Sequence, residues 1–388
     1  MQLIDRIFTD RFLKNLDHLR YGKLQVTLPT GQQHSFVGPL PGPSATLVLH
    51  DLSVISNLVQ KGDVGFAQDY QAGRWECDDL THLMTLGMMN EEALADYIFG
   101  SRLMQMLGNL SYFLRRNSLQ GSRRNIHAHY DLGNDFYSLW LDSSMTYSAA
   151  LFTAPQQSLE QAQDCKYDRI IDRLEGSSGS LIEVGCGWGG FADRALQRGD
   201  FNIKGITLSE RQHDYARAKL GPRADIALED YRHQEGRFDH IVSIEMFEAV
   251  GERYWPTYFS KMAALLKPGG KAVVQTITIA DDRFDTYRNS TDVIRSFIFP
   301  GGMLPSPERF REAAGRQGLR VNDAFHFGQD YATTLEHWLQ RFNSRENEVR
   351  ALGFDNRFVR LWRFYLASCI AGFRTNRTSV MQVEMQHA

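Results

Sequence analysis

The sequence contains few cysteines, and their spacing excludes two common kinds of stabilising site. No two of them form a Cys-x-x-Cys pair. We therefore predict neither a disulfide framework nor a zinc or other metal site, and free thiols favour the reducing environment of the cytoplasm. The cysteines are Cys77, Cys165, Cys186 and Cys369.

Long apolar runs and a strong net charge are also absent. The chain opens with MQLIDRIFTDRFLKN, in which apolar and charged residues alternate, and no stretch approaches the length needed to cross a bilayer. The formal net charge is only −3, so no general field would attract nucleic acid. We expect a cytoplasmic protein that is soluble or, at most, peripheral to the inner leaflet of the membrane.

The first hundred residues differ in pattern from the rest. The runs GKLQVTLP, HSFVGPL and ATLVLHD alternate apolar and polar residues between Gly and Pro, which predicts a meander of antiparallel strands. Helical spacing follows in SVISNLVQKG and LTHLMTLGMMN. We expect a small α+β domain over residues 1–100.

A basic, amphipathic linker is predicted over residues 101–126. Its apolar residues fall on one helical stripe beside several arginines, which suits either a helix packed on the core or a helix at a membrane surface. Arg123 and Arg124 favour contact with phospholipid phosphates. We therefore prefer the membrane-surface interpretation.

Strands and helices alternate from about residue 180 onward. The runs SLIEV, NIKGIT, DIALE, DHIVSI and KAVVQTI are short and rich in β-branched residues, and helical patterns follow most of them. This order predicts an α/β fold with a doubly wound parallel sheet, whose functional site lies at the carboxyl ends of the strands. We assign the catalytic domain to residues 127–388.

A glycine-rich turn follows the first of these strands, in LIEVGCGWGGFA. Gly185, Gly187 and Gly190 match the dinucleotide fingerprint G-x-G-x-x-G. A dinucleotide site also needs an acidic residue at the end of the second strand, where Thr207 stands instead. The fingerprint alone is therefore weak evidence for a nicotinamide cofactor.

Other residues near this turn favour S-adenosylmethionine (SAM). Glu183 completes the pattern E-x-G-x-G-x-G, with Gly189 as its last glycine, and its carboxylate can orient the loop and the ammonium group of the ligand. After the third strand, Asp230 is placed to accept from the adenine amino group and Tyr231 to cover the ring face. A cationic sulfonium ligand favours carboxylates and aromatic faces, whereas a pyrophosphate favours neither.

Several longer motifs resemble one enzyme family. They occur in the order found in cyclopropane-fatty-acyl-phospholipid synthases and mycolic-acid cyclopropane synthases, and they cover nearly the whole chain. The segment GDVGFAQDYQAGRWECDDL resembles only the phospholipid enzymes, which implies that the N-terminal domain presents lipid. The motifs are HYDLGNDFYSLWLDSSMTYSAALF, GCGWGG, GITLSERQ, SIEMFEAVG, FIFPGGMLPS and HFGQDYATTLEHW.

The resemblance implies a Rossmann-like SAM-dependent methyltransferase domain and roles for particular residues. It places Tyr147 and Ser148 in a segment that closes over the cofactor. It also implies a bicarbonate ion that accepts a proton, with Glu248 and Tyr331 as catalytic residues around it. The further implied contacts are Thr207, Leu208 and Gln212 with the cofactor, a backbone group of Ile277 with bicarbonate, and Tyr130 and Phe136 with the acyl chain.

The chain departs from the family at the bicarbonate site. Ala149 and Gln275 stand where the best-known phospholipid enzymes have a cysteine and a histidine. Glutamine can donate a hydrogen bond but carries no charge, so we expect Gln275 to hold the ion more weakly or differently. Cys369 aligns with a cysteine once proposed as catalytic, but its helical spacing with aromatic residues favours a buried structural thiol.

These observations predict a SAM-dependent C-methyltransferase that acts on unsaturated acyl chains of membrane phospholipids and forms cyclopropane rings. The motifs QTITI and EAVG also resemble a sister branch of methyltransferases that places a methylene or methyl branch on the acyl chain. A lipid-binding scaffold that keeps SAM without catalysis is a third alternative. The sequence leaves open whether the protein forms a homodimer.

Overall fold

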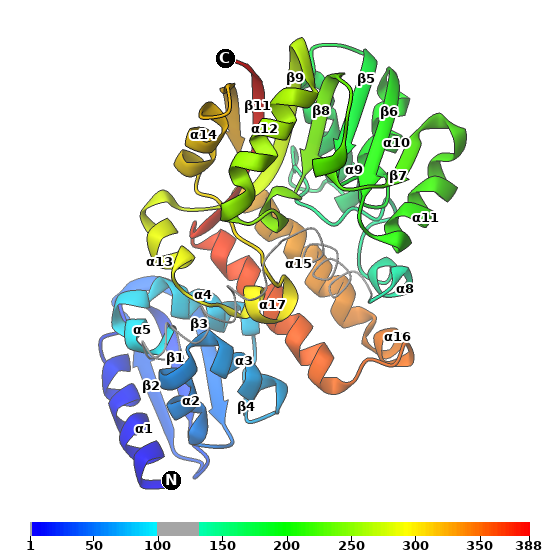
Figure 1. Ribbon diagram of the computed structural model, residues 1–388. Coiled ribbons are helices and arrows are strands. Elements are labelled where there is room, and N and C mark those ends of the chain that lie inside the picture. Colours follow the sequence, from blue (N-terminus) through cyan, green and yellow to red (C-terminus); the bar gives the residue numbers. More distant parts are fainter. Residues whose placement is uncertain (1, 99–131) are drawn as a thin grey trace. The chain divides into compact units, whose positions relative to one another are not determined.

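The computed structural model describes residues 2–98 and 132–388 (Figure 1). The chain forms two compact units, and each draws on separate stretches of sequence. Among the described residues, unit 1 comprises residues 2–98, 286–300 and 342–377, and unit 2 comprises residues 132–285, 301–341 and 378–388. The predicted linker, residues 101–126, lies outside the described residues, so it and the division at residues 100 and 127 stay predictions.

Unit 1 is an α+β structure around a four-stranded sheet in the order β2-β1-β3-β4. Its strands are β1 (Tyr21–Thr27), β2 (Gln33–Val37), β3 (Leu40–Leu49) and β4 (Trp75–Glu76). Its helices are α1 (Gln2–Leu16), α2 (Ser53–Lys61), α3 (Asp63–Gln71), α4 (Leu80–Met89), α5 (Glu91–Ile98), the π-helix η6 (Ile294–Ile298), α16 (Glu346–Ala351) and α17 (Asn356–Arg374).

The prediction of an antiparallel meander is wrong for one pair of strands. β1 pairs antiparallel with β2 but parallel with β3, because the chain crosses the start of β1 before β3 begins. Where this parallel pair begins, the two backbones lie in close contact: a Cβ at Gly42 would lie 2.8 Å from the backbone nitrogen of Gly22, and one at Gly22 2.2 Å from the carbonyl oxygen of Pro43. Glycine is therefore required at both positions.

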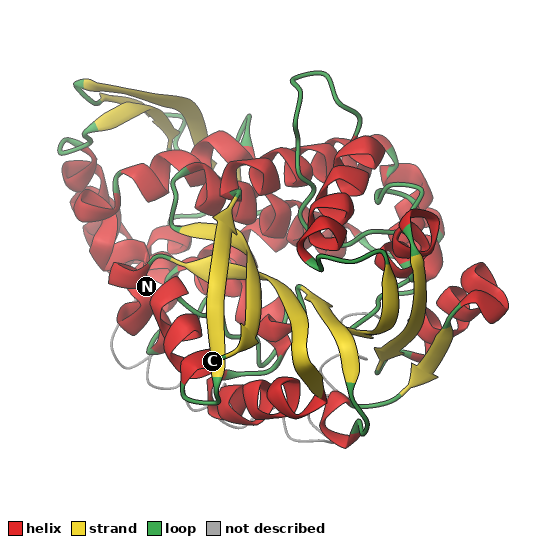
Figure 2. Ribbon diagram, turned by 90° about the horizontal axis from the view of Figure 1, so that it is seen from above, coloured by secondary structure: helices red, strands yellow, loops and turns green. Residues whose placement is uncertain are grey.

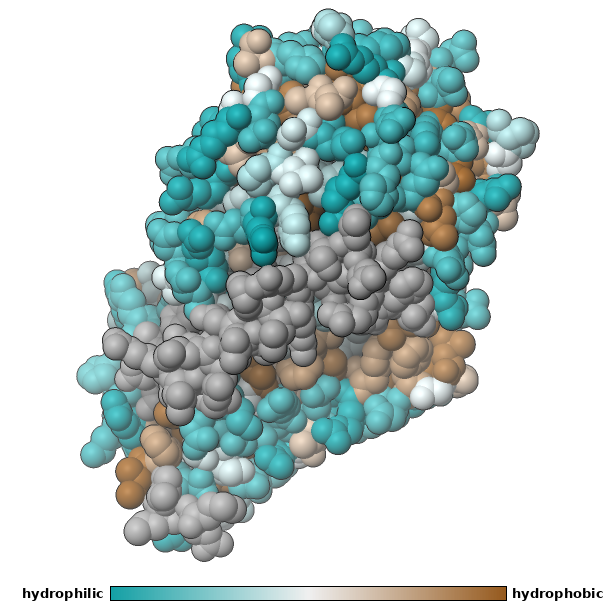
Figure 3. Space-filling view, in the orientation of Figure 1, coloured by the Kyte–Doolittle hydropathy of each residue, from teal (hydrophilic) through white to brown (hydrophobic). Residues whose placement is uncertain are grey.

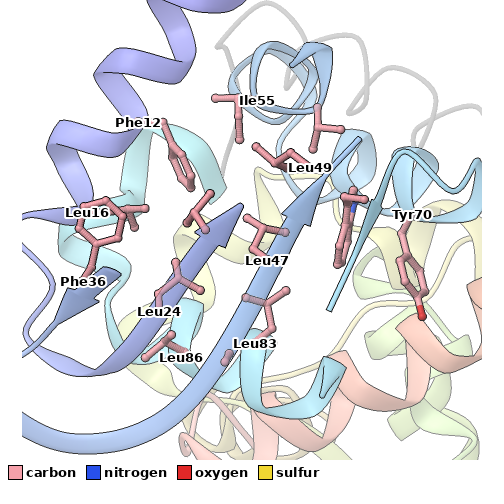
Figure 4. Close-up of a cluster of buried hydrophobic side chains, with 14 of the residues drawn as sticks. Phe12, Leu16, Leu24, Phe36, Leu47, Leu49, Ile55, Tyr70, Leu83 and Leu86 are labelled. Atoms are coloured by element: carbon pink, nitrogen blue, oxygen red, sulfur yellow. The ribbon is translucent and has the colours of Figure 1, made fainter. Parts of the chain in front are cut away.

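The core of unit 1 lies between its sheet and its helices (Figure 4). Phe12 and Leu16 of α1 and Ile55 of α2 contribute to one buried cluster with Leu24 of β1. Phe364 of α17 belongs to the same cluster, although it lies more than 300 residues from β3 in the sequence. This shared burial explains why residues 342–377 form part of unit 1.

Unit 2 contains a seven-stranded sheet in the order β10-β11-β9-β8-β5-β6-β7. Its strands are β5 (Ser178–Val184), β6 (Asp200–Thr207), β7 (Asp225–Leu228), β8 (Phe238–Ile244), β9 (Leu266–Ile279), β10 (Leu319–His326) and β11 (Thr378–His387). Its helices are α8 (Asn134–Ser138), α9 (Leu159–Arg173), α10 (Gly190–Arg198), α11 (Glu210–Leu220), α12 (Trp255–Leu265) and α14 (Pro307–Gly315). Two further helices cross the limits of the units, α13 (Phe284–Arg288) and α15 (Gly328–Ser344).

The predicted parallel sheet is confirmed over β5 to β9. Each of the five predicted runs forms a strand, and β5, β6, β7, β8 and β9 pair in parallel. Two strands were not predicted: β11 lies between β9 and β10 and is antiparallel to both. The fold is therefore α/β and Rossmann-like, with one antiparallel strand inserted near an edge.

Helices cover both faces of this sheet (Figures 1 and 2). α9, α10 and α11 pack through one buried cluster that includes Phe191 and Leu220. α12 and α14 meet through Phe259 and Phe310, whose ring centroids are 5.0 Å apart. On the face of unit 2 shown in Figure 3, hydrophilic residues predominate. Within the described residues, every helix is too short or too polar to span a bilayer.

Candidate active site

One cavity in unit 2 collects most of the residues that the sequence assigned to the cofactor. It lies where β5, β6, β7 and β8 end, as expected for an α/β sheet. Gly189 and Asp230 are the predicted cofactor residues that do not line it. Those that do are Tyr147, Ser148, Glu183, Gly185, Gly187, Thr207, Leu208, Gln212 and Tyr231.

The turn after β5 requires its glycines. Gly185 has φ +85°, and a Cβ there would lie 2.9 Å from Cγ of Met246. Gly189 has φ +78° and precedes α10, where a Cβ would lie 3.0 Å from Cδ1 of Leu220. Gly187, with φ +54°, faces open space in the cavity. The first and last of these glycines shape the turn, and the middle one leaves room for a ligand.

Glu183 provides the clearest sign that the cavity fits SAM. The residue is 2% exposed, and its Oε2 atom has no hydrogen-bond partner among the described residues. Burial raises the pKa of this carboxyl well above its usual value. A buried acceptor in the cavity wall matches the ammonium group of SAM, because a cationic donor would satisfy the oxygen and favour its ionised form.

The end of β6 presents a second set of polar groups to the cavity. The hydroxyl of Thr207 donates to Oε1 of Gln212 over 2.9 Å and accepts from the backbone N–H of Ser209. Ser209 also caps α11 by accepting from the backbone N–H of Gln212. These bonds fix the direction of the Thr207 and Gln212 side chains, which the resemblance assigns to SAM.

The segment after β7 differs in detail from the prediction. Asp230 is 4% exposed and binds the guanidinium of Arg232, which holds its pKa below the usual value although burial alone would raise it. Its neighbours Glu229, Tyr231 and Arg232 line the cavity. The predicted contact between Asp230 and adenine stays a prediction.

The segment of Tyr147 and Ser148 is fixed by a turn around Asp142. The Asp142 carboxylate accepts from the backbone N–H groups of Ser144 and Thr146. The hydroxyl of Ser148 accepts a 2.7 Å hydrogen bond from Nζ of Lys166, a fully buried lysine of α9. Burial lowers the pKa of Lys166 to about 7. Sequence analysis missed this lysine, because nothing in its local sequence distinguishes it from a surface residue.

Glu245 is the centre of the polar cluster in the cavity wall, and sequence analysis missed it as well. It directly follows β8, and its carboxylate accepts from the hydroxyl of Tyr331 over 2.6 Å. It also accepts from the side-chain amide of Gln275 and the backbone N–H of Ala149, each over 2.8 Å. The signal was present in SIEMFEAVG, which contains two glutamates, but the resemblance points only to the second.

That second glutamate, Glu248, lies beside this cluster. It accepts a hydrogen bond from the backbone N–H of Ile277, and its Oε2 atom has no partner among the described residues. Burial, together with the negative charge of Glu245, raises the pKa of Glu248 to about 8. The structure thus brings Glu248 to Ile277, but Tyr331 and Gln275 to Glu245.

Aromatic side chains surround the same region of unit 2. The ring centroid of Trp338 lies 5.2 Å from that of Tyr147 and 6.1 Å from that of Tyr331. Phe136, predicted to contact the acyl chain, is fully buried against Tyr137 and does not line the SAM cavity.

The two remaining predicted site residues are Tyr130 and Cys369. Tyr130 lies outside the described residues. Cys369 is in α17 of unit 1 and does not line the SAM cavity; burial raises the pKa of its thiol to about 12, which disfavours the reactive thiolate. A catalytic role of Cys369 is therefore not proposed further.

Comparison with known proteins places the chain in a family. Residues 117–383 match the family described as mycolic acid cyclopropane synthetase. The tuberculostearic acid methyltransferase UfaA1 of Mycobacterium tuberculosis is 37% identical over 87% of this chain and 82% of its own length. The cyclopropane-fatty-acyl-phospholipid synthase of Escherichia coli strain K12 is 33% identical over 84% of each chain.

Solved structures agree with this placement. The mycolic acid cyclopropane synthase CmaA1 in complex with SAH and CTAB has a TM-score of 0.64 and 30% identity, covering 68% of this chain and 98% of its own. The cyclopropane synthase MmaA2 from Mycobacterium tuberculosis has the same TM-score at 28% identity, covering 68% of this chain and 97% of its own. The chain belongs to the family of cyclopropane fatty acid and mycolic acid cyclopropane synthases, and it is a SAM-dependent C-methyltransferase.

Proposed function

We propose that this enzyme transfers a methylene group from SAM to the cis double bond of unsaturated acyl chains in membrane phospholipids and so forms cyclopropane fatty acids. The observation that supports this most is the carboxylate of Glu245, which lines the same cavity as the SAM-binding residues. Methyl transfer to an alkene must end with the loss of a proton from carbon, and a carboxylate in this cavity is placed to accept it. The contact with a membrane surface is part of this proposal.

The alkene is a weak nucleophile, so the enzyme must hold it in line with the methyl donor. Bound SAM supplies an electrophilic methyl group on its sulfonium. Glu183, Thr207 and Gln212 hold the donor in one orientation, and the fixed segment around Tyr147 closes the cavity beside it. Positioning of the two reactants is the first contribution of the protein.

Methyl transfer leaves a carbocation on the acyl chain, which water would trap. The aromatic rings of Tyr147, Tyr331 and Trp338 lie together in unit 2, and their faces stabilise positive charge. A base must then remove a proton from the added methyl group, and the ring closes.

One observation favours a second product. The relative with 37% identity is named as a tuberculostearic acid methyltransferase, and Ala149 and Gln275 depart from the phospholipid enzymes. From the same cation, a hydride shift followed by loss of a proton from the methyl group gives a methylene branch instead of a ring. Both products therefore need a base next to the transferred methyl group.

Mass spectrometry of lipid products separates these functions. The purified protein is incubated with methyl-labelled SAM and vesicles of a cis-monounsaturated phospholipid, and the fatty acids are analysed as methyl esters. Vesicles of the saturated phospholipid are the matched control and are expected to stay unlabelled. Label in a ring supports the proposal, and label in a branch supports the second product. Bound SAM without any labelled lipid would contradict both and favour a non-catalytic lipid-binding scaffold.

A further inference from the structure

Glu245 has a backbone conformation that directs its side chain into the active site. It has φ +50°, which is unusual for a residue other than glycine, and its backbone N–H donates to the carbonyl of Gln275 in β9. The carboxylate lines the cavity beside Glu183, Met246 and Ala249. Such a conformation is maintained only where the surrounding structure enforces it, and it occurs preferentially at functional sites.

The donors around this carboxylate are themselves held in place. The side-chain oxygen of Gln275 accepts from the amide of Gln382 over 3.0 Å, so the nitrogen of Gln275 is directed to Glu245. The oxygen of Gln382 accepts in turn from Arg169. The buried ammonium of Lys166 also favours a negative charge on Glu245. The Glu245 carboxylate is thus held in a preorganised position by three hydrogen-bond donors.

This arrangement does not fit the bicarbonate ion that the family resemblance implies. Tyr331 has one hydroxyl proton and Ala149 has one backbone proton, and both are donated to Glu245. The single backbone proton of Ile277 is donated to Glu248. An added anion would therefore have to displace the Glu245 carboxylate to reach these donors, and its charge would be repelled by that carboxylate.

We propose that the Glu245 carboxylate is the catalytic base and takes the place of an external bicarbonate ion. This inference rests on the proposed function. In the step, a C–H bond of the transferred methyl group breaks, and its electron pair forms the C–C bond that closes the ring at the cationic carbon. The proton passes to Glu245, so that a cation and a carboxylate become a neutral lipid and a neutral carboxylic acid.

The surroundings of Glu245 suit this task. Burial raises its pKa, which makes the carboxylate a stronger base, while the hydrogen bonds from Tyr331, Ala149 and Gln275 and the charge of Lys166 act in the opposite direction and favour its ionised form. The cation and the carboxylate neutralise each other in a site of low dielectric constant, which favours the transfer. The base also needs no binding step, because it is part of the chain.

Bicarbonate dependence gives the first test. Label transfer by the wild-type protein is measured in carbon-dioxide-free buffer with and without added bicarbonate. We expect rates within about twofold of each other, since the base is supplied by the chain. A rate that falls on depletion and returns with bicarbonate would overturn this proposal but not the proposed function. No label in either buffer would overturn the proposed function, and this proposal with it.

Variants of Glu245 give the second test. We expect Glu245→Gln to lower kcat by about 100-fold or more, the range expected for a lost general base, with SAM affinity close to that of the wild type. Glu235→Gln, at an exposed position of the same unit, is the matched control. Near-normal kcat in Glu245→Gln would contradict the proposal.

Chemical rescue separates a base from a merely structural anchor. In Glu245→Ala, the vacated donors can bind a small carboxylate, so formate and acetate should restore part of the rate, and acetate, the stronger base, should be more effective at equal occupancy. Circular dichroism and SAM binding show whether the variant is folded. A folded variant that binds SAM, stays inactive with every carboxylate and shows no rescue by bicarbonate would overturn the assignment.

Discussion

Replacing Tyr331 by phenylalanine tests the role of Glu245 without removing the carboxylate. The substitution deletes one hydroxyl, which donates to Oε2 of Glu245 over 2.6 Å, and keeps the ring beside Trp338. A hydrogen bond to a charged group contributes about 1.5–3 kcal/mol. Its loss leaves the Glu245 anion with the donors of Gln275 and Ala149 and makes ionisation less favourable.

The direction of the effect follows from the base mechanism. A carboxylate accepts a proton only when ionised, so activity is present above its pKa and is lost as the pH falls through it. Because about 1.4 kcal/mol corresponds to one pH unit, the acidic limb of the kcat profile should move to higher pH by about one to two units in Tyr331→Phe.

The assay is label transfer to phospholipid vesicles measured across a pH series. Tyr215→Phe in α11 removes a hydroxyl from the same unit away from Glu245 and is the matched control. We expect its profile to coincide with that of the wild type. An acidic limb that stays in place in Tyr331→Phe, with the protein folded, would refute the claim that this hydroxyl stabilises the ionised base.

Three further predictions concern stability. Gly189→Ala should destabilise the protein by about 1–2 kcal/mol and weaken SAM binding, because position 189 has φ +78°; an unchanged melting temperature would contradict this. Trp75→Ala should lower the free energy of unfolding by about 3–5 kcal/mol, because this fully buried ring stacks on Phe66 with the ring centroids 4.0 Å apart. Denaturant unfolding measures this loss. A loss below about 1 kcal/mol would refute the prediction. Burial, aided by Asp292, raises the pKa of Asp63 to about 7. The folded state then binds more protons than the unfolded state between about pH 4 and 7, so stability falls as the pH rises through this window. Asp63→Asn should remove this dependence of stability on pH. If the melting temperatures of the wild type and the variant change with pH in the same way, the prediction is wrong.

Local sequence patterns predicted the strands that carry the site. β5 to β9 are short β-branched runs, and the glycines after β5 occupy conformations that few other residues adopt. Glu183 and Thr207 could be placed at the cavity because parallel strands end at one edge of the sheet. These features depend on residues close together in the sequence.

The strand pairings and the site residue that could not be predicted depend on packing between segments far apart in the sequence. β1 and β3 pair in parallel because the chain crosses the start of β1 between β2 and β3, and β11 inserts beside β9 from a segment about 100 residues later. The choice between two glutamates in SIEMFEAVG depends on which carboxylate Tyr331 of α15 reaches. A strand pattern shows that both glutamates follow β8, but it does not show which of them meets a helix 86 residues away.

The central claim is that a base removes a proton from the methyl group that SAM donates. SAM with a trideuterated methyl group tests it directly, with cis-monounsaturated phospholipid vesicles as acceptor and mass spectrometry of the product. Our account predicts that the added carbon retains two of its three deuterium atoms, in the ring or in a methylene branch. Retention of all three would mean that the proton leaves from another carbon, and it would contradict the account.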